Sequence, residues 1–235
     1  MSAPLTTPAR RRDLVVLVAI PCATAYAVLT WLVATGRTVA LDDATYQLFR
    51  PGGVWAGAQL IFGNVVDDLQ PAVCGLVLLV VALYSALRQR SWTPIVLVAV
   101  LTVPTVLIIF GTKAVVDRVD PAGGFLPGRG AYSSGHAAFI LLCSAGVAML
   151  IHRPVRPWAY LVVAALCVLM ALSLLWIGSH WVSDVVGGTL VGLVVLPLAC
   201  LLPVRGLRRP PRGRQGSPPP RPRVRAPDAS GLHNG

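Results

Sequence analysis

Long apolar segments alternate with short polar breaks from about residue 14 to residue 205. A helix that spans a bilayer needs roughly 20 mostly apolar residues. Six segments approach or reach that length, at 14–35, 69–87, 93–112, 135–151, 158–178 and 183–204. Because backbone polar groups in lipid must satisfy one another, helices are the expected form. The pattern therefore predicts an all-α fold, a bundle of six transmembrane helices.

We expect this bundle to be one membrane domain at 14–205, between an N-terminal tail at 1–13 and a C-terminal tail at 206–235. The C-terminal tail is rich in Pro, Arg, Gly and Ser, so it is predicted to be disordered and attracted to anionic lipid heads. The N-terminal arginines, the apolar run and Ala23-Thr24-Ala25 resemble a signal peptide. Since the apolar run continues to Ala34, a retained helix is the preferred interpretation.

Composition agrees with a membrane protein. The chain is 55% hydrophobic and 12% charged, which leaves too little polar surface to cover a soluble globule of this size. The five cysteines all fall inside apolar stretches without a Cys-x-x-Cys pair, so they are interpreted as small core residues.

The charges predict an orientation. Arginines lie before the first segment, between the second and third, between the fourth and fifth, and after the sixth. The positive-inside rule places these four sites in the cytoplasm, with both termini, for a multi-pass protein of the cell membrane. Six of the nine acids fall in the remaining breaks, at 36–68, 113–134 and 179–182, and Asp184 lies just inside the outer end of the sixth segment. Membrane orientation explains the net charge of +11 better than nucleic acid binding does.

The first outer stretch has an apolar face of its own. Between the Gly52-Gly53 break and Pro71, the apolar residues are spaced to give a helix one apolar face; they are Trp55, Leu60, Ile61, Phe62 and Val65. A helix lying in the membrane interface is predicted there, and an ordered loop is the alternative.

Three side chains capable of chemistry meet the predicted outer face from different segments. Lys113 closes the third segment, His136 opens the fourth, and His180 opens the sixth. His152 and His233 fall on the cytoplasmic side. The outer trio is therefore the candidate site.

Two local patterns support it. His180 and Asp184 are four residues apart, so on a helix the carboxylate can hydrogen-bond one imidazole nitrogen and leave the other free to attack. In Ser133-Ser134-Gly135-His136, hydroxyls and backbone N–H groups at a helix start can bind an anion. Taken singly, each pattern also fits a structural ion pair or an N-cap without ligand.

Together these groups suggest phosphoryl transfer. His180 would attack phosphorus, Asp184 would stabilise the imidazolium, and His136 would protonate the leaving oxygen. Lys113, Ser134 and Gly135 would bind the phosphate.

Three motifs carry a resemblance to a known family. They are Lys113 to Pro121, Ser133 to His136, and Ser173 to Asp184. Their order and spacing resemble those of the type 2 phosphatidic acid phosphatases, which are membrane-embedded lipid phosphatases. The family's motifs read lysine, six residues, Arg-Pro; then Pro-Ser-Gly-His; then Ser-Arg, five residues, His, three residues, Asp. The resemblance covers roughly residues 14–205 and implies six helices, a phosphohistidine intermediate and no metal or other cofactor.

The sequence departs from these motifs at three positions. Asp120 and Leu174 stand where the family has arginines, and Ser133 replaces a proline. Arginine binds phosphate through a planar fork that lysine cannot reproduce. Arg118 and Arg129 are the candidates to restore a cation.

We therefore expect an enzyme that hydrolyses a lipid phosphate or pyrophosphate at the extracytoplasmic face. A phosphatase-like protein that binds lipid phosphate or a partner without turnover is the alternative that Asp120 and Leu174 motivate. A metal-dependent hydrolase, a transporter and a structural bundle are further alternatives, and the metal ligands would be Asp117, Asp120, His136, His180 and Asp184. The sequence leaves the substrate and the oligomeric state open.

Overall fold

The computed structural model describes residues 8–50, 58–121, 123, 130–152 and 154–203. These residues form helices and connecting segments, with no β-strand among them. The α-helices are α1 (Pro8–Ala34), α2 (Val39–Phe49), α3 (Ala58–Asp68), α4 (Pro71–Gln89), α5 (Thr93–Val116), α6 (Gly135–Ile151), α7 (Pro157–Ile177) and α8 (Val182–Val195). A 3-10 helix, η1 (Leu196–Leu201), continues α8. The predicted all-α class is confirmed.

Each predicted span coincides with a helix. Five stretches are long and apolar enough to cross a membrane, namely Val15–Ala34, Pro71–Gln89, Thr93–Val116, Pro157–Ile177 and Val182–Leu201. α6 is apolar but shorter, with 17 residues. The chain is therefore a multi-pass membrane protein, and the count of six spans stays a prediction.

Helix boundaries follow from local backbone chemistry. Proline occupies the first turn of α4, α5 and α7, where its missing N–H costs no helical hydrogen bond. α7 ends at Gly178, whose φ of 70° is left-handed. A Cβ at Gly178 would also lie 2.2 Å from Arg50 Nη1. This glycine therefore both stops α7 and admits the Arg50 side chain.

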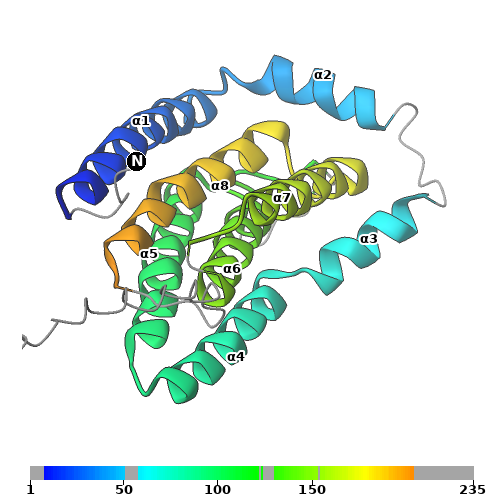
Figure 1. The fold of residues 1–235 in the computed structure, drawn as a ribbon. Coiled ribbons are helices and arrows are strands. Elements are labelled where there is room, and N and C mark those ends of the chain that lie inside the picture. The colour runs from blue at the N-terminus through cyan, green and yellow to red at the C-terminus, as the bar shows by residue number, and fades with distance from the viewer. Residues whose placement is uncertain (1–7, 51–57, 122, 124–129, 153, 204–235) are drawn as a thin grey trace, which may run out of the picture.

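The first outer stretch contains two helices, whereas the sequence predicted one (Figure 1). α3 lies where a helix was expected, and α2 was not foreseen. Phe62 of α3 packs against Trp176 of α7 with ring centroids 5.3 Å apart, while Leu60 and Ile61 are exposed. Trp55 lies outside the described residues, and placement of α3 in the membrane interface stays a prediction.

α6 is the centre of the bundle. It packs against α4, α5, α7 and α8, and nine of its 17 residues are buried. A Cβ at Gly146 would meet Leu78 and Leu101 at 2.9 Å, so this glycine lets α4 and α5 approach α6. α8 also packs closely against the residue before α6, because a Cβ at Gly188 would lie 2.1 Å from the Ser134 carbonyl oxygen. The contact at Gly188 holds α8 beside the start of α6.

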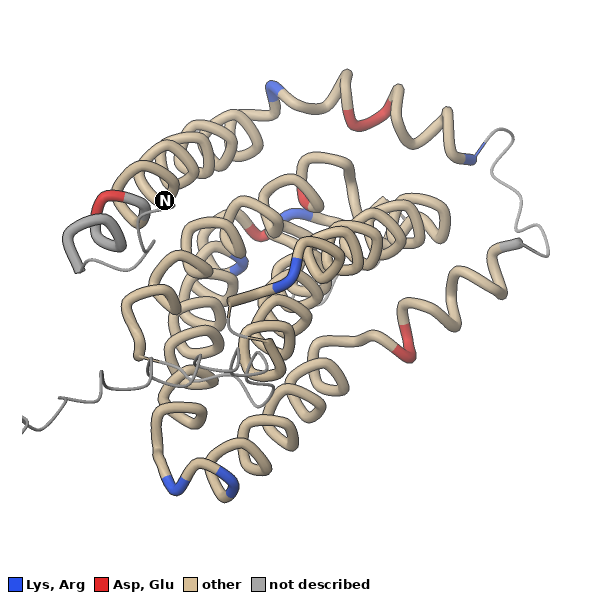
Figure 2. Tube along the Cα trace, viewed as in Figure 1, with Lys and Arg blue, Asp and Glu red and all other residues tan. Residues whose placement is uncertain are grey.

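Basic residues lie at the turn between α4 and α5, and Arg37 and Arg50 flank the acids of α2. Figure 2 shows basic residues at the turn between α4 and α5, away from the acidic residues of α2 and of the α3 end. Many large apolar side chains of the outer helices are exposed, including Leu17, Phe110 and Leu161. Lipid is the solvent that suits such a surface. Both predicted tails extend beyond the described residues, and α1 begins at Pro8 instead of residue 14.

Candidate active site

The three reagents predicted from the sequence line one cavity. Lys113 from the end of α5, His136 from the first turn of α6, and His180 from the turn before α8 surround a space of about 330 Å³. The imidazole rings of His136 and His180 have centroids 6.2 Å apart and planes inclined by 64°. Gly135 and Asp120 also line this space. Three elements far apart in the sequence thus bring two imidazoles and an ammonium group together.

His180 is paired with Asp184 by a different route from the one predicted. α8 begins at Val182, so His180 lies in the turn before the helix and not on it. Asp184 reaches back, and its Oδ2 accepts a hydrogen bond from the Trp181 backbone N–H at 2.9 Å. The same oxygen lies 3.5 Å from His180 Nδ1. With Nδ1 turned toward the carboxylate, Nε2 is the nitrogen left for the cavity.

The Nδ1–Oδ2 contact is long. A distance of 3.5 Å suits an ion pair but exceeds the usual hydrogen bond, and within the described part of the chain Nδ1 has no hydrogen-bond partner. Catalytic hydrogen bonds are often long before substrate binds and tighten in the reacting complex. Asp184 is fully buried, so it cannot exchange this role for a contact with water.

The start of α6 differs in detail from the predicted anion site. Ser134 is the N-cap, and its hydroxyl accepts a hydrogen bond from the Ala137 N–H at 3.4 Å. Its own N–H donates to the Asp184 carbonyl oxygen at 3.0 Å, and Ser133 Oγ lies 3.3 Å from the Tyr26 hydroxyl. Both serines are fully buried. Their hydroxyls therefore bond to other protein groups. Gly135 and His136, at the positive end of the helix dipole, line the cavity.

Lys113 is held at the cavity by the backbone of a neighbouring segment. Its Nζ donates a hydrogen bond to the Gly130 carbonyl oxygen. Gly130 in turn packs so closely that an added Cβ would lie 2.8 Å from the Arg118 backbone nitrogen. The ammonium group is thus positioned by the segment that connects α5 to α6.

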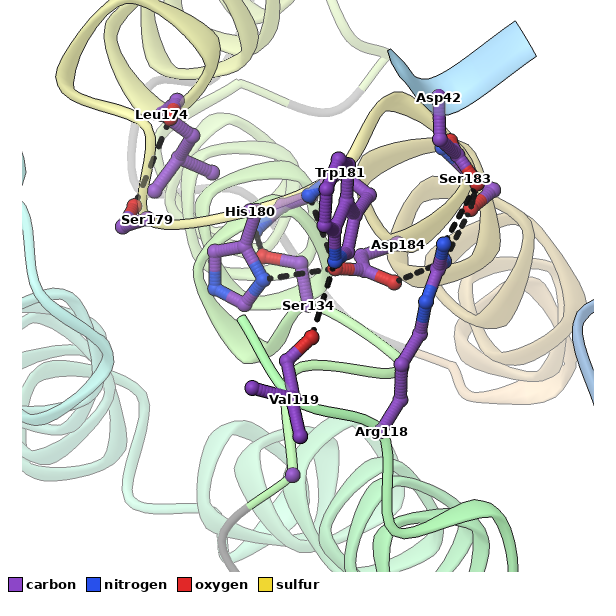
Figure 3. Close-up of polar contacts among 12 residues, drawn as sticks. Asp42, Arg118, Val119, Ser134, Leu174, Ser179, His180, Trp181, Ser183 and Asp184 are labelled. Carbon is purple, nitrogen blue, oxygen red and sulfur yellow. Dashed lines mark hydrogen bonds and ion pairs between the residues drawn. The ribbon is translucent and has the colours of Figure 1, made fainter. Parts of the chain in front are cut away.

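Arg118 does not occupy the place predicted for it. Instead of lining the cavity as a phosphate donor, its guanidinium faces the far side of Asp184 (Figure 3). Nη1 donates to Ser183 Oγ at 2.6 Å and to Asp184 Oδ1 at 3.1 Å. Nη2 donates to Asp42 Oδ2 at 2.7 Å. The other candidate cation, Arg129, lies outside the described residues.

Asp42 is a site residue that sequence reasoning missed. It lies on α2, is 1% exposed, and accepts hydrogen bonds from the Ser183 N–H at 3.0 Å and from Ser183 Oγ at 2.9 Å. No motif joins Asp42 to residues 141 positions away. The available signal was an acid in an otherwise apolar stretch, which in a membrane protein needs a partner.

The two residues that replace the family's arginines lie in different surroundings. Asp120 lines the cavity. Leu174 is fully buried in the apolar core of α7, and its carbonyl oxygen accepts a hydrogen bond from the Ser179 N–H at 3.2 Å. Position 174 therefore contributes packing and a turn, and no phosphate-binding group.

The metal-dependent alternative required several acids and imidazoles to gather. Within the ranges that the structure describes, no group of three or more His, Cys, Asp or Glu side chains is placed to hold a metal ion. His136 and His180 instead share the cavity wall with Lys113 and Asp120, and Asp184 lies behind His180.

The fold and this cavity define a multi-pass membrane protein with a histidine-lined site. Residues 112–206 match the PAP2 superfamily. The structure resembles the crystal structure of a transmembrane PAP2-type phosphatidylglycerolphosphate phosphatase from Bacillus subtilis, with a TM-score of 0.66 and 16% identity over 77% of this chain and 93% of that one. No curated protein matches the sequence. Both comparisons support the resemblance to the PAP2 family that the motifs predicted.

Proposed function

We propose that the protein is a membrane-embedded phosphatase that hydrolyses a lipid phosphate or pyrophosphate at the extracytoplasmic face through a phosphohistidine intermediate. One observation carries the proposal. Lys113, His136 and His180 come from three separate elements and line the same cavity, with the two imidazole centroids 6.2 Å apart. A phosphate group between them can touch a nucleophile, a proton donor and a cation together.

The first chemical step forms a bond between His180 Nε2 and phosphorus. The phosphorus–oxygen bond to the lipid breaks, and His136 gives its proton to that leaving oxygen. Asp184 beside Nδ1 stabilises the positive charge that develops on the His180 ring. Lys113 and the first turn of α6 stabilise charge on the phosphoryl oxygens.

The second step releases phosphate. His136, now neutral, takes a proton from a water molecule, whose oxygen attacks phosphorus. The phosphorus–nitrogen bond breaks, and its electron pair returns to His180. Inorganic phosphate leaves, and the proton that His136 gained restores the starting enzyme. No external oxidant, reductant or cofactor is needed for this balance.

A lipid substrate is supported by the cavity walls. Val106 and Phe110 of α5 line the cavity and are also exposed on the outside of the bundle. A headgroup can therefore reach the histidines while its apolar chain stays in the bilayer. Membrane lipids surround the exposed apolar helices in the same way.

The proposed orientation rests on charge. Arg88 and Arg90 lie at the end of α4, beside the turn that leads to α5 and at the opposite end of α5 from Lys113. The positive-inside rule then places this turn and both termini in the cytoplasm, and the cavity on the other side. The protein would lie in the cell membrane with six spans.

A second candidate function is binding of lipid phosphate without turnover. Asp120 favours it, because it stands on the cavity wall where the family has a phosphate-binding arginine, and Leu174 supplies no compensating donor. Loss of two charged hydrogen bonds, at about 1.5–3 kcal/mol each, corresponds to roughly two to four decades in rate. Turnover separates the two candidates.

Phosphate release from the purified full-length protein tests the proposal. The substrates would be phosphatidic acid, phosphatidylglycerol phosphate and an isoprenoid pyrophosphate, each without added metal and with a chelator. We expect release from at least one of them, abolished by His180→Ala and unchanged by His233→Ala in the C-terminal tail. Release that persists in His180→Ala would contradict the mechanism, and binding with no release from any substrate would favour the second candidate.

A further inference from the structure

The two oxygens of Asp184 have different partners. Oδ2 accepts from the Trp181 N–H at 2.9 Å and lies 3.5 Å from His180 Nδ1. Oδ1 accepts from Arg118 Nη1 at 3.1 Å. A carboxylate held from both sides cannot rotate about its terminal bond without losing one set of contacts. The orientation of Asp184 toward His180 therefore depends on Arg118.

Arg118 is itself held by Asp42. Its Nη2 lies 2.7 Å from Asp42 Oδ2, and its side chain is 15% exposed, against 1% for Asp42 and none for Asp184. Ser183 joins Asp42 to Arg118, because it donates its N–H and its hydroxyl to Asp42 and accepts from Arg118 Nη1. Helix α2 is thus tied to the catalytic turn through buried charges (Figure 3).

The same contacts fix the charge behind His180. One guanidinium lies between two carboxylates, so the set keeps one net negative charge when all three are ionised. Buried ions of this kind persist only when they are paired and hydrogen-bonded. Without Asp42, Arg118 would neutralise Asp184 outright and leave no net negative charge to favour a positive ring at His180.

We propose that Arg118 is a positioning residue that acts on His180 through Asp184, and that Asp42 on α2 is the anchor that sets the orientation and charge of Arg118. This inference rests on the proposed function, in which His180 is the nucleophile. It assigns α2 a role in catalysis although α2 contributes no residue to the cavity wall.

Other charged or titratable groups also face His180. They are Asp184 from α8, His136 from α6, Lys113 from α5 and Asp120 from the segment after α5. All four stay unchanged when Asp42 or Arg118 is substituted. A change in the titration of His180 in those variants therefore reports on the Asp42–Arg118 pair.

The first test follows the ring of His180 by NMR in full-length protein in lipid nanodiscs, with labelled histidine and His180→Ala for assignment. Asp42→Asn keeps the shape of the side chain and removes its charge, so the titration midpoint of the ring should fall by about half a pH unit or more. Asp43→Asn, an exposed neighbour on the same helix, should leave the midpoint unchanged. An unchanged midpoint in folded Asp42→Asn overturns the inference.

The second test measures phosphate release from the best substrate of the wild type. Arg118→Met should lower kcat about 30-fold or more with KM changed by less than about threefold, because the loss is in orientation and not in phosphate binding. Arg118→Lys should recover part of kcat, since it restores the charge but not the fork. A rise in KM at unchanged kcat would instead make Arg118 a phosphate ligand and overturn the inference.

The two tests also separate this inference from the proposed function. If the wild type releases no phosphate, the proposed function fails, and the NMR titration still decides whether Asp42 and Arg118 act on His180. If the wild type is active and neither variant has the stated effect, only the inference fails.

Discussion

His136 and His180 face one cavity with their ring centroids 6.2 Å apart, although they belong to different elements and are 44 positions apart in the sequence. The separation leaves room for a phosphoryl group between a nucleophilic nitrogen and a proton donor. Neither ring can do both tasks at once, because attack and protonation occur on opposite sides of phosphorus. The proposed mechanism therefore assigns attack to His180 and protonation of the leaving oxygen to His136.

His136 should matter most for poor leaving groups. In His136→Ala the loss of a general acid should slow release from a lipid phosphate by roughly 100-fold or more. Release from p-nitrophenyl phosphate should fall much less, because its leaving oxygen needs little protonation. Comparing the two substrates in wild type and variant checks this role, and equal losses for both would argue against it.

Replacing Asp120 with arginine should speed phosphate release. Because position 120 lines the cavity, Asp120→Arg introduces a forked phosphate donor there and should raise kcat/KM by about tenfold or more. Asp120→Asn, which only removes the charge, should give a smaller rise. Steady-state kinetics on the three proteins decides the matter, and a fall in both variants would show that Asp120 contributes to turnover.

Close packing of α8 on the start of α6 should be essential for stability. A Cβ at Gly188 would lie 2.1 Å from the Ser134 carbonyl oxygen, so Gly188→Ala must push backbone apart and should cost about 1–3 kcal/mol. Gly75 on α4 has no such neighbour within 4 Å, and Gly75→Ala should be neutral or stabilising. Thermal unfolding in detergent measures both. Equal Tm values would mean that α8 and α6 are less closely packed than described.

The orientation can be tested without activity. A tag at the C-terminus should be protected from protease in intact spheroplasts and cleaved after the membrane is permeabilised. A tag in the segment at 124–129, between α5 and α6, should be cleaved in both. The reverse pattern would place the cavity in the cytoplasm and contradict the proposed site of hydrolysis.

Much of the fold could be read from the sequence because length and hydropathy alone mark a spanning helix. The approach of Lys113, His136 and His180 was predicted because the alternation of spans puts all three at the same face of the membrane. α2 could not be predicted in this way, since the burial of Asp42 depends on Arg118 and Ser183, which are remote in sequence.

The start of α8 was misplaced for a more local reason. The four-residue spacing from His180 to Asp184 predicted both residues on the helix, whereas Asp184 caps the helix from its third position by accepting the Trp181 N–H. An acid at that position is a recognised helix-start signal, and it could have placed the boundary after His180. Arg118 was expected to bind phosphate because its place in the sequence puts a cation near the site. The sequence did not indicate that two buried acids, Asp42 and Asp184, would bind its guanidinium.

The most direct measurement is the detection of a phosphoryl group on His180. Full-length protein would be mixed with an excess of its best lipid phosphate substrate, quenched in alkali to preserve phosphohistidine, digested, and analysed by mass spectrometry. The proposed mechanism predicts phosphate on the peptide that contains His180 and none on that peptide in His180→Ala. Phosphate on another residue, or full turnover by His180→Ala, would contradict it.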